Sequence, residues 1–312
     1  MKRILLAAAS LAVLLPATPA SAADGPAPRH VTYSVITRAG GMVDVAGLEW
    51  RPRGAKTVLL AIHGSEGVKE NNWGPMPVPG YSFANRRYKE HRATVAIDLP
   101  GYGQSGGDRT YAGMEDYAFV VAQVASDLRS SYTHVVGVGH SVGGGLVDIT
   151  QGMFQSFDAI IPASWSHGRF SPEYLATCGA NKCPSVYKIL FWTPQADRRV
   201  MKAFVAPLER FSTFFSLDIG IWGGAFWYTY PPFPNPQPDD LSYLVTVPVL
   251  IILGKQDYFW DHAYLTEEPS HFPMSKDVTL LLLPNTGHAV FHHLNHDYVE
   301  RYVGSWLDKR GF

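Results

Sequence analysis

The sequence of 312 residues is poor in cysteine and carries almost no excess of charge. It holds 2 cysteines, 26 basic and 27 acidic residues, and the basic residues form no block. Such a chain lacks the concentrated positive charge typical of nucleic-acid binding, so no nucleic-acid partner is expected. Its 46% hydrophobic and 17% charged residues exclude a disordered chain and predict a sizeable core.

Long apolar runs are scarce as well. The apolar stretch 4–15 is shorter than the ~20 residues that cross a bilayer, and later runs are broken by glycine, proline or charge. Two basic residues precede this stretch and small residues follow it at 20–22, which is the pattern of a cleaved secretory signal. Residues 1–22 are therefore predicted to be a signal peptide. The mature protein is expected to be secreted, with no membrane span and no lipid anchor.

The two cysteines, Cys178 and Cys183, lie close together in the stretch CGANKC. In an oxidising compartment a local disulfide closing this small loop is the expected state. Two free thiols are the alternative.

Apolar runs typical of buried strands alternate with helical stretches along most of the chain. Such alternation predicts an α/β fold with a mostly parallel, doubly wound sheet. The residues 23–164 and 247–312 are expected to form the core, preceded by an antiparallel pair near 31–50. The expected strands are 57–64, 93–105, 133–141, 157–164, 247–257 and 278–288, and the expected helices are 81–91, 114–132, 142–154 and 290–309.

The segment 165–246 differs in composition and is predicted to be a cap inserted over the carboxyl edge of the sheet. Nine of the 23 residues from 211 to 233 are aromatic, and five prolines between 231 and 238 favour an extended stretch. Aromatic side chains above a reactive group usually line an apolar pocket. The candidate substrate contacts are Phe215, Trp222, Phe226 and Trp227.

The stretch GVGHSVGGG places Ser141 between an expected strand and an expected helix. A serine at such a sharp turn adopts a strained backbone and projects its hydroxyl above the sheet. The chain on either side of it comes close together, so Gly139 and Gly143 are needed because a Cβ there would clash. The pattern predicts Ser141 as a nucleophile.

A serine hydroxyl needs a base, and the base needs an orienting acid. Asp257 ends the stretch LIILGKQD and His288 ends LLPNTGH, so both are expected at the carboxyl ends of neighbouring strands. Asp261 is the alternative acid, although an aspartate at such a turn is often only a helix cap.

The histidine has competitors in His292, His293 and His296. Positions 288, 292 and 296 would share one face of a helix, a spacing that can bind metal. The zinc-peptidase pattern requires a glutamate beside the first histidine, where Ala289 stands. No metal site is therefore expected, and a metal-dependent hydrolase is the weakest alternative.

An oxyanion hole needs two N–H donors. The candidates are the backbone of Val142, directly after the nucleophile, and that of Ser65, in the loop after the strand 57–64. His63 is expected to orient this loop and His140 to pack or hydrogen-bond beside the nucleophile. Glu66 is expected to be solvated, with a contact to the polar end of a substrate as the alternative.

These motifs together resemble the α/β-hydrolase fold superfamily over nearly the whole mature chain. The matching residues are HG at 63–64, DLPGYGQS at 98–105, GHSVGG at 139–144, GKQD at 254–257 and GH at 287–288. The run GHSVGGG is similar to that of secreted bacterial lipases, cutinase-like esterases and carbon–carbon bond hydrolases. The serine nucleophile counts against haloalkane dehalogenases and epoxide hydrolases, which carry aspartate there. The large aromatic insertion departs from the minimal cutinase fold.

The resemblance implies a secreted serine hydrolase that cleaves an ester of a small to medium apolar substrate, without a cofactor. The same triad could cleave amides, or carbon–carbon bonds in diketones. A peptidase directed to a free amine would use a carboxylate of the cap, such as Glu173 or Glu209. A non-catalytic ligand-binding protein on the same fold is the alternative from another class. The oligomeric state stays open.

Overall fold

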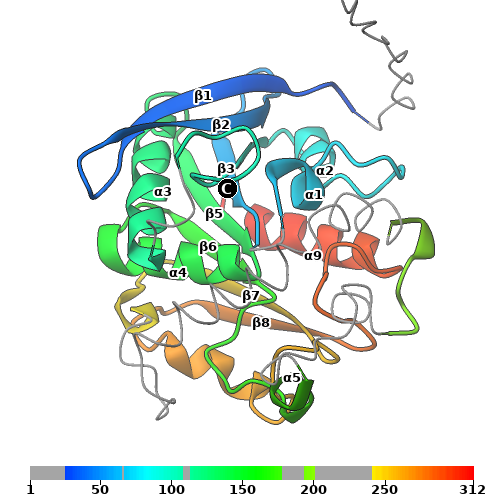
Figure 1. Cartoon of the computed structure of the whole chain (residues 1–312). Helices are drawn as coiled ribbons and strands as arrows, with labels where there is room; N and C mark the ends of the chain where they lie inside the picture. The colour runs from blue at the N-terminus through cyan, green and yellow to red at the C-terminus, as the bar shows by residue number, and fades with distance from the viewer. Residues whose placement is uncertain (1–24, 65–66, 108–112, 178–192, 201–240) are drawn as a thin grey trace, which may run out of the picture.

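The computed structural model describes residues 25–64, 67–107, 113–177, 193–200 and 241–312. Within these residues eight strands form one sheet, in the order β1-β2-β4-β3-β5-β6-β7-β8 (Figure 1). The strands are β1 (Arg29–Ile36), β2 (Met42–Trp50), β3 (Thr57–Ile62), β4 (Ala93–Ile97), β5 (His134–His140), β6 (Ala159–Ala163), β7 (Val249–Gly254) and β8 (Val278–Leu283). The helices are α1 (Lys69–Trp73), α2 (Phe83–Lys89), α3 (Met114–Leu128), α4 (Val142–Phe154), α5 (Pro172–Thr177) and α9 (His296–Asp308), with 3-10 turns η3 (Ser242–Leu244) and η4 (Leu265–His271).

The sheet is mostly parallel, as predicted. Strand β1 pairs antiparallel with β2, and β2 pairs antiparallel with β4, whereas all pairings from β4 to β8 are parallel. From β3 the chain continues to β4 on one side and, after α3, to β5 on the other. The carboxyl ends of β3 and β5 therefore meet where the strand order reverses, and open α/β sheets bind their ligands at such a point.

Helices cover both faces of the sheet, which explains why its central strands are continuous apolar runs. Every residue of β3 and of β7 is buried. Successive side chains of a strand point to opposite faces, so Leu60 packs in the core beneath α3 and α4, and its neighbour Leu59 packs in the core beneath α2 and α9 (Figure 1).

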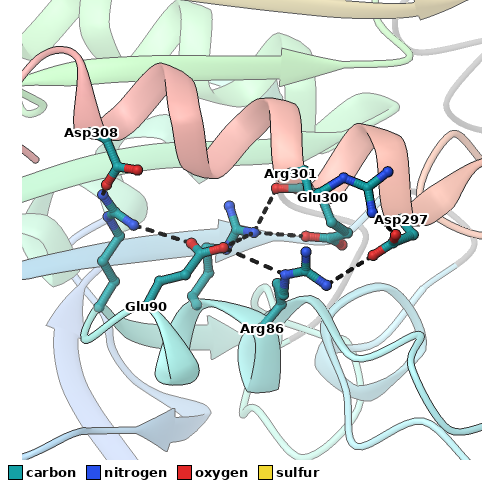
Figure 2. Close-up of polar contacts among 8 residues, drawn as sticks. Arg86, Glu90, Asp297, Glu300, Arg301 and Asp308 are labelled. Atoms are coloured by element: carbon teal, nitrogen blue, oxygen red, sulfur yellow. Dashed lines mark hydrogen bonds and ion pairs between the residues drawn. The ribbon is translucent and has the colours of Figure 1, made fainter.

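An ion-pair network joins α2 to α9 on the second face (Figure 2). Arg87 of α2 is fully buried, and its guanidinium donates to the main-chain oxygen of Glu300 at 2.8 Å and lies 3.2 Å from the Glu300 carboxylate. Burial raises the pKa of Glu300 to about 7, with the charge of Arg87 opposing and that of Glu90 adding to the shift. The network also includes Arg86, Arg92, Asp297, Arg301 and Asp308.

The predicted elements recur, but the strands within 93–105 and 278–288 end at Ile97 and Leu283, where turns follow, and the last helix begins late. The helix predicted over 142–154 is α4, with the same bounds, and the antiparallel pair near 31–50 is β1 and β2. The helix predicted over 290–309 begins only at His296, so that prediction was wrong for 290–295. These residues form a loop, in which the N–H of Leu294 donates to the carbonyl of Gln195 and the side chain of His293 binds Gly287 and Ala289.

The segment predicted as a cap is described only at 165–177, 193–200 and 241–246. The first two of these parts contact the two loops that carry Asp257 and His288. Ser171 Oγ donates to the Tyr258 carbonyl at 2.6 Å, and the N–H of Leu294 donates to the Gln195 carbonyl at 2.7 Å. The predicted signal peptide lies outside the described residues, and the domain boundaries stay predictions. Among the helices that the structure describes, none is long and apolar enough to span a membrane.

Candidate active site

Ser141 lies at the turn between β5 and α4, as the sequence predicts. Its φ of 56° and ψ of −125° place it in a region that residues with a side chain rarely adopt. Its N–H donates to the Ala163 carbonyl of the neighbouring strand at 2.8 Å, and its own carbonyl accepts the N–H of Gly144 at 2.7 Å. These bonds hold the strained turn at the carboxyl edge of the sheet.

The glycines beside Ser141 are required by close approach of the backbone. A Cβ on Gly139 would overlap the carbonyl of Gly143, as predicted, whereas one on Gly143 would overlap the carbonyl of Ile62 in β3. Two further glycines, Gly144 and Gly145, face Trp165, whose side chain would lie 2.6–2.7 Å from an added Cβ at either position. The first turn of α4 can therefore bear no side chains toward β3 or Trp165.

His288 and Asp257 are brought together by the loops after β8 and β7. The His288 Nδ1 lies 2.7 Å from the Asp257 Oδ2, and the two residues are 1% and 0% exposed. The other carboxylate oxygen of Asp257 accepts the N–H of Phe259 at 2.9 Å. Asp261, the alternative acid, instead accepts the N–H of Ala263 within its own turn.

Gly254 at the end of β7 allows the loop of His288 to pass close to the sheet. A Cβ on Gly254 would overlap the carbonyls of Thr286 and Gly287, both of which are backbone atoms. The stretch GKQD therefore supplies Asp257 and, through Gly254, the space in which the His288 loop passes.

The main-chain carbonyl of His288 is also bound. His140 Nε2 lies 3.0 Å from it, and because a carbonyl only accepts, this nitrogen carries the proton and donates. The His140 and His288 rings meet edge to face with centroids 5.0 Å apart. His140, which was expected to pack or hydrogen-bond beside the nucleophile, thus bonds to the main chain of His288.

The side chain of His293 forms hydrogen bonds with the residues on either side of His288. Its Nε2 accepts the N–H of Gly287 at 3.1 Å, and its Nδ1 donates to the carbonyl of Ala289 at 2.8 Å. Burial lowers the pKa of His293 to about 4, so the ring is neutral at neutral pH and can accept from Gly287.

The histidines expected on one helical face do not share one, because α9 begins only at His296. His296 instead stacks on Tyr81 with ring centroids 3.7 Å apart. The part of the chain that the structure describes holds no group of three or more His, Cys, Asp or Glu side chains suited to a metal ion.

The edge where an oxyanion hole is expected lies between β3 and α4. Val142 is the first residue of α4, whereas Ser65 and Glu66 lie outside the described residues. The expected role of His63 in ordering this loop has a structural basis, since its Nδ1 donates to the Gly64 carbonyl at 2.6 Å and its Nε2 accepts the N–H of Leu99 at 3.1 Å.

Lys69 was missed by sequence reasoning. It is 1% exposed, and both its backbone N–H and its Nζ donate to the carboxylate of Asp98, at 2.8 and 2.6 Å. The N–H of Gln104 donates to the same carboxylate at 2.8 Å. This buried ion pair ties the start of α1 to the turn DLPGYGQS. The sequence signal for this ion pair was Asp98 itself, a charged residue directly after a buried strand.

Aromatic side chains follow Asp257 in the loop after β7. Phe259 lies against the imidazole of His288, with ring centroids 4.5 Å apart. Trp260 stacks on Phe170 with an interplanar angle of 9° and meets Trp165 edge to face. The run DYFWD, which begins with the predicted acid, was the sequence signal that could have predicted Phe259 and Trp260 near the site. The predicted substrate contacts Phe215, Trp222, Phe226 and Trp227, and the predicted disulfide between Cys178 and Cys183, lie outside the described residues.

A serine at a strained strand-to-helix turn, on the same sheet edge as a histidine bonded to a buried aspartate, is the arrangement of hydrolases that act through an activated serine. Residues 58–301 match the sequence profile of the alpha/beta hydrolase family. The chain belongs to this family, which confirms the predicted superfamily and the prediction of a hydrolase. No curated protein matches the chain.

Solved structures with the same fold include enzymes of several kinds. A bacterial membrane phospholipase A, described as a virulence factor, has a TM-score of 0.67 and 18% identity, over 90% of this chain and 86% of that one. An esterase of Pyrococcus furiosus has a TM-score of 0.60 and 16% identity, over 90% and 91% of the two chains. A serine hydrolase involved in carbazole degradation has a TM-score of 0.61 and 17% identity, over 89% and 99%. At these identities the likeness establishes the fold alone.

Proposed function

We propose that the protein is a secreted serine hydrolase that cleaves a carboxylic ester of a small to medium apolar substrate. Ser141 Oγ attacks the ester carbonyl while His288 Nε2 takes its proton. His288 then passes that proton to the leaving alcohol as the bond between the acyl carbon and the alcohol oxygen breaks. Water, deprotonated by His288, attacks the acyl-enzyme; the bond between the acyl carbon and Ser141 Oγ breaks, His288 returns the proton to Oγ, and the acid is released.

The observation that carries this proposal is the hydrogen bond between His288 and Asp257. The carboxylate accepts from Nδ1, so the proton of the neutral ring is held there and Nε2 is left as the basic nitrogen. As the ring becomes an imidazolium, the buried carboxylate at 2.7 Å also stabilises its positive charge.

The oxyanion is proposed to be held by the N–H groups of Val142 and Ser65. Support for Val142 comes from its place at the start of α4, where backbone N–H groups and the helix dipole favour negative charge.

The preference for an apolar substrate is supported by Phe259, whose partly exposed ring lies beside His288. Trp165, which packs against the first turn of α4, and Phe170 are also partly exposed. Such rings at a site's edge offer contact area for an acyl chain or an aromatic group. The four aromatic residues named from the insertion are proposed to extend this surface.

The first test is hydrolysis of p-nitrophenyl esters across acyl lengths by the wild type and Ser141→Ala. We expect turnover by the wild type only, with an optimal acyl length that measures the size of the apolar site. A matched control is Ser130→Ala, a serine at the end of α3 whose hydroxyl bonds only locally to Asp127. Equal turnover by the wild type and Ser141→Ala would exclude the serine mechanism.

Amide and diketone substrates, tested in the same assay format, separate the ester assignment from the other reactions open to the triad. Turnover of either with none of any ester would replace the proposed substrate class. Secretion is tested by expressing the full chain in a bacterial host and sequencing the amino terminus of exported protein. An exported chain that starts near residue 23 is expected, and retention of residues 1–22 in the cytosol would contradict secretion.

A further inference from the structure

Ser164 lies between the strands that lead to the proposed nucleophile and acid. It directly follows β6, which pairs with β5 on one side and β7 on the other. Its side chain is fully buried, so it offers no contact to a substrate in solution.

The backbone of Ser164 is held from two directions. Its N–H donates to the Ile252 carbonyl of β7 at 2.8 Å. Its carbonyl accepts the indole N–H of Trp260 at 3.1 Å. The position of the hydroxyl is therefore set by the sheet and by the aromatic cluster, and it does not depend on loop 284–295.

The Ser164 Oγ donates to the main-chain carbonyl of His288 at 2.5 Å. His140 Nε2 donates to the same oxygen at 3.0 Å. Together with the bond from the ring to Asp257, three neighbouring strands each supply one bond to His288. They are β5 through His140, β6 through Ser164 and β7 through Asp257.

The backbone conformation of Ser164 indicates that a serine side chain is required at this position. Its φ is 56°, in the left-handed region where glycine is the unstrained residue. A serine in this conformation costs stability relative to glycine, and such outliers gather where the surrounding structure needs a particular group.

We propose that Ser164 is a positioning residue, which fixes the main chain of His288 so that its imidazole is aligned with Ser141. The inference rests on the proposed serine mechanism. The bond to Asp257 alone would allow the imidazole to pivot about Nδ1, whereas a second bond at the main-chain carbonyl removes that freedom. Small displacements of a reacting group can reduce rates about 100-fold, and the chemistry here requires a short proton path from Ser141.

The test compares Ser164→Gly and Ser164→Ala with the wild type. Glycine removes the hydroxyl and also relieves the backbone, whereas alanine removes the hydroxyl and keeps the backbone strain. We expect Ser164→Gly to melt at or above the wild-type temperature yet to lose about tenfold or more in kcat, with KM changed less than about twofold. Ser164→Ala should lose kcat similarly and melt at a lower temperature than Ser164→Gly. The matched control is Gln155→Gly, which relieves a left-handed residue of φ 51° at the end of α4, at the opposite end of that helix from Ser141.

Labelling of Ser141 by a fluorophosphonate measures alignment without reference to the natural substrate. The wild type and Gln155→Gly should label at equal rates, and both Ser164 variants more slowly. If the wild type labels and Ser164→Gly labels at the same rate with unchanged kcat, the positioning role is wrong and the serine mechanism stands. If the wild type does not label at all, both proposals fail.

A double variant tests whether His140 and Ser164 act on the same atom. His140→Phe should slow labelling, and adding Ser164→Gly should slow it by a factor that differs from the product of the two single effects, because both donors bind one carbonyl. Strictly multiplicative effects would show that the two residues act independently and would overturn the shared-acceptor argument.

Discussion

Replacing His293 with glutamine should make the stability of the protein less sensitive to acid. The neutral ring of His293 accepts from Gly287 and donates to Ala289, and burial lowers its pKa from 6.5 to about 4. Glutamine can make both bonds, since its amide oxygen accepts and its amide nitrogen donates, but it does not titrate.

The magnitude follows from the difference in proton binding between the two states. Between about pH 6.5 and pH 4 the unfolded chain protonates this histidine and the folded protein does not, so stability falls as the pH falls through that window. Taking a pKa of 6.5 unfolded and about 4 folded, the loss between pH 7 and pH 5 is about 2 kcal/mol. His296, whose pKa burial also lowers to about 4, contributes in the same direction but is present in both proteins.

The assay is urea unfolding at pH 7, 6 and 5, followed by tryptophan fluorescence. We expect the wild type to lose about 2 kcal/mol more of its unfolding free energy over this range than His293→Gln loses. The control is His30→Gln, an exposed histidine on β1, which should lose as much as the wild type. Equal losses for His293→Gln and the wild type would refute the buried, neutral state of His293.

Three further predictions concern the acid, the close approach at β7 and the ion-pair network. Asp257→Asn should reduce kcat on an ester substrate by about 10³–10⁴-fold through loss of the required tautomer, while Asp261→Asn should stay within about threefold; the reverse order would identify Asp261 as the acid. Gly254→Ala should lower the unfolding free energy by about 1–3 kcal/mol and reduce kcat, because the new methyl group displaces the backbone of Thr286; an unchanged melting temperature would contradict that contact. The pKa of Glu300 is raised from 4.5 to about 7, so its contribution to stability is present below about pH 4.5 and is lost as the pH rises through 7. Urea unfolding should therefore show that Glu300→Gln loses less stability than the wild type between pH 5 and pH 8.

The elements near Ser141 could be predicted because their causes are local. The run from β5 through Ser141 to α4 contains its own strand, turn and helix signals, so the bounds of α4 agree with the prediction. The start of α9 could not be predicted in this way. His293 binds Gly287 and Ala289, and Leu294 binds Gln195, which is about a hundred residues away in the chain. These contacts take backbone groups that a helix would have used, and periodicity contains no information about them.

The same reason explains which site residues were found. Asp257 and His288 lie in the loops that follow β7 and β8, and this placement is visible in the sequence. The hydroxyl of Ser164 donates to the carbonyl of His288, 124 positions later in the chain. The sequence around neither residue indicates this contact. Lys69 is similar, because its partner Asp98 belongs to another loop. Local sequence patterns thus indicated the proposed reacting groups, and long-range packing determined the residues that hold them.

The fit of Trp165 against Gly145 has a consequence for how this protein can diverge. A side chain at this glycine would occupy volume that the indole already fills. An alanine at 145 therefore becomes tolerable only in a lineage that has first replaced Trp165 with something smaller. At Gly144 an added methyl group would instead meet the Cβ of Trp165, which every residue except glycine carries. The order of mutational steps at 145 and 165 is constrained, and a homologous chain with a methyl group at position 145 should lack the tryptophan.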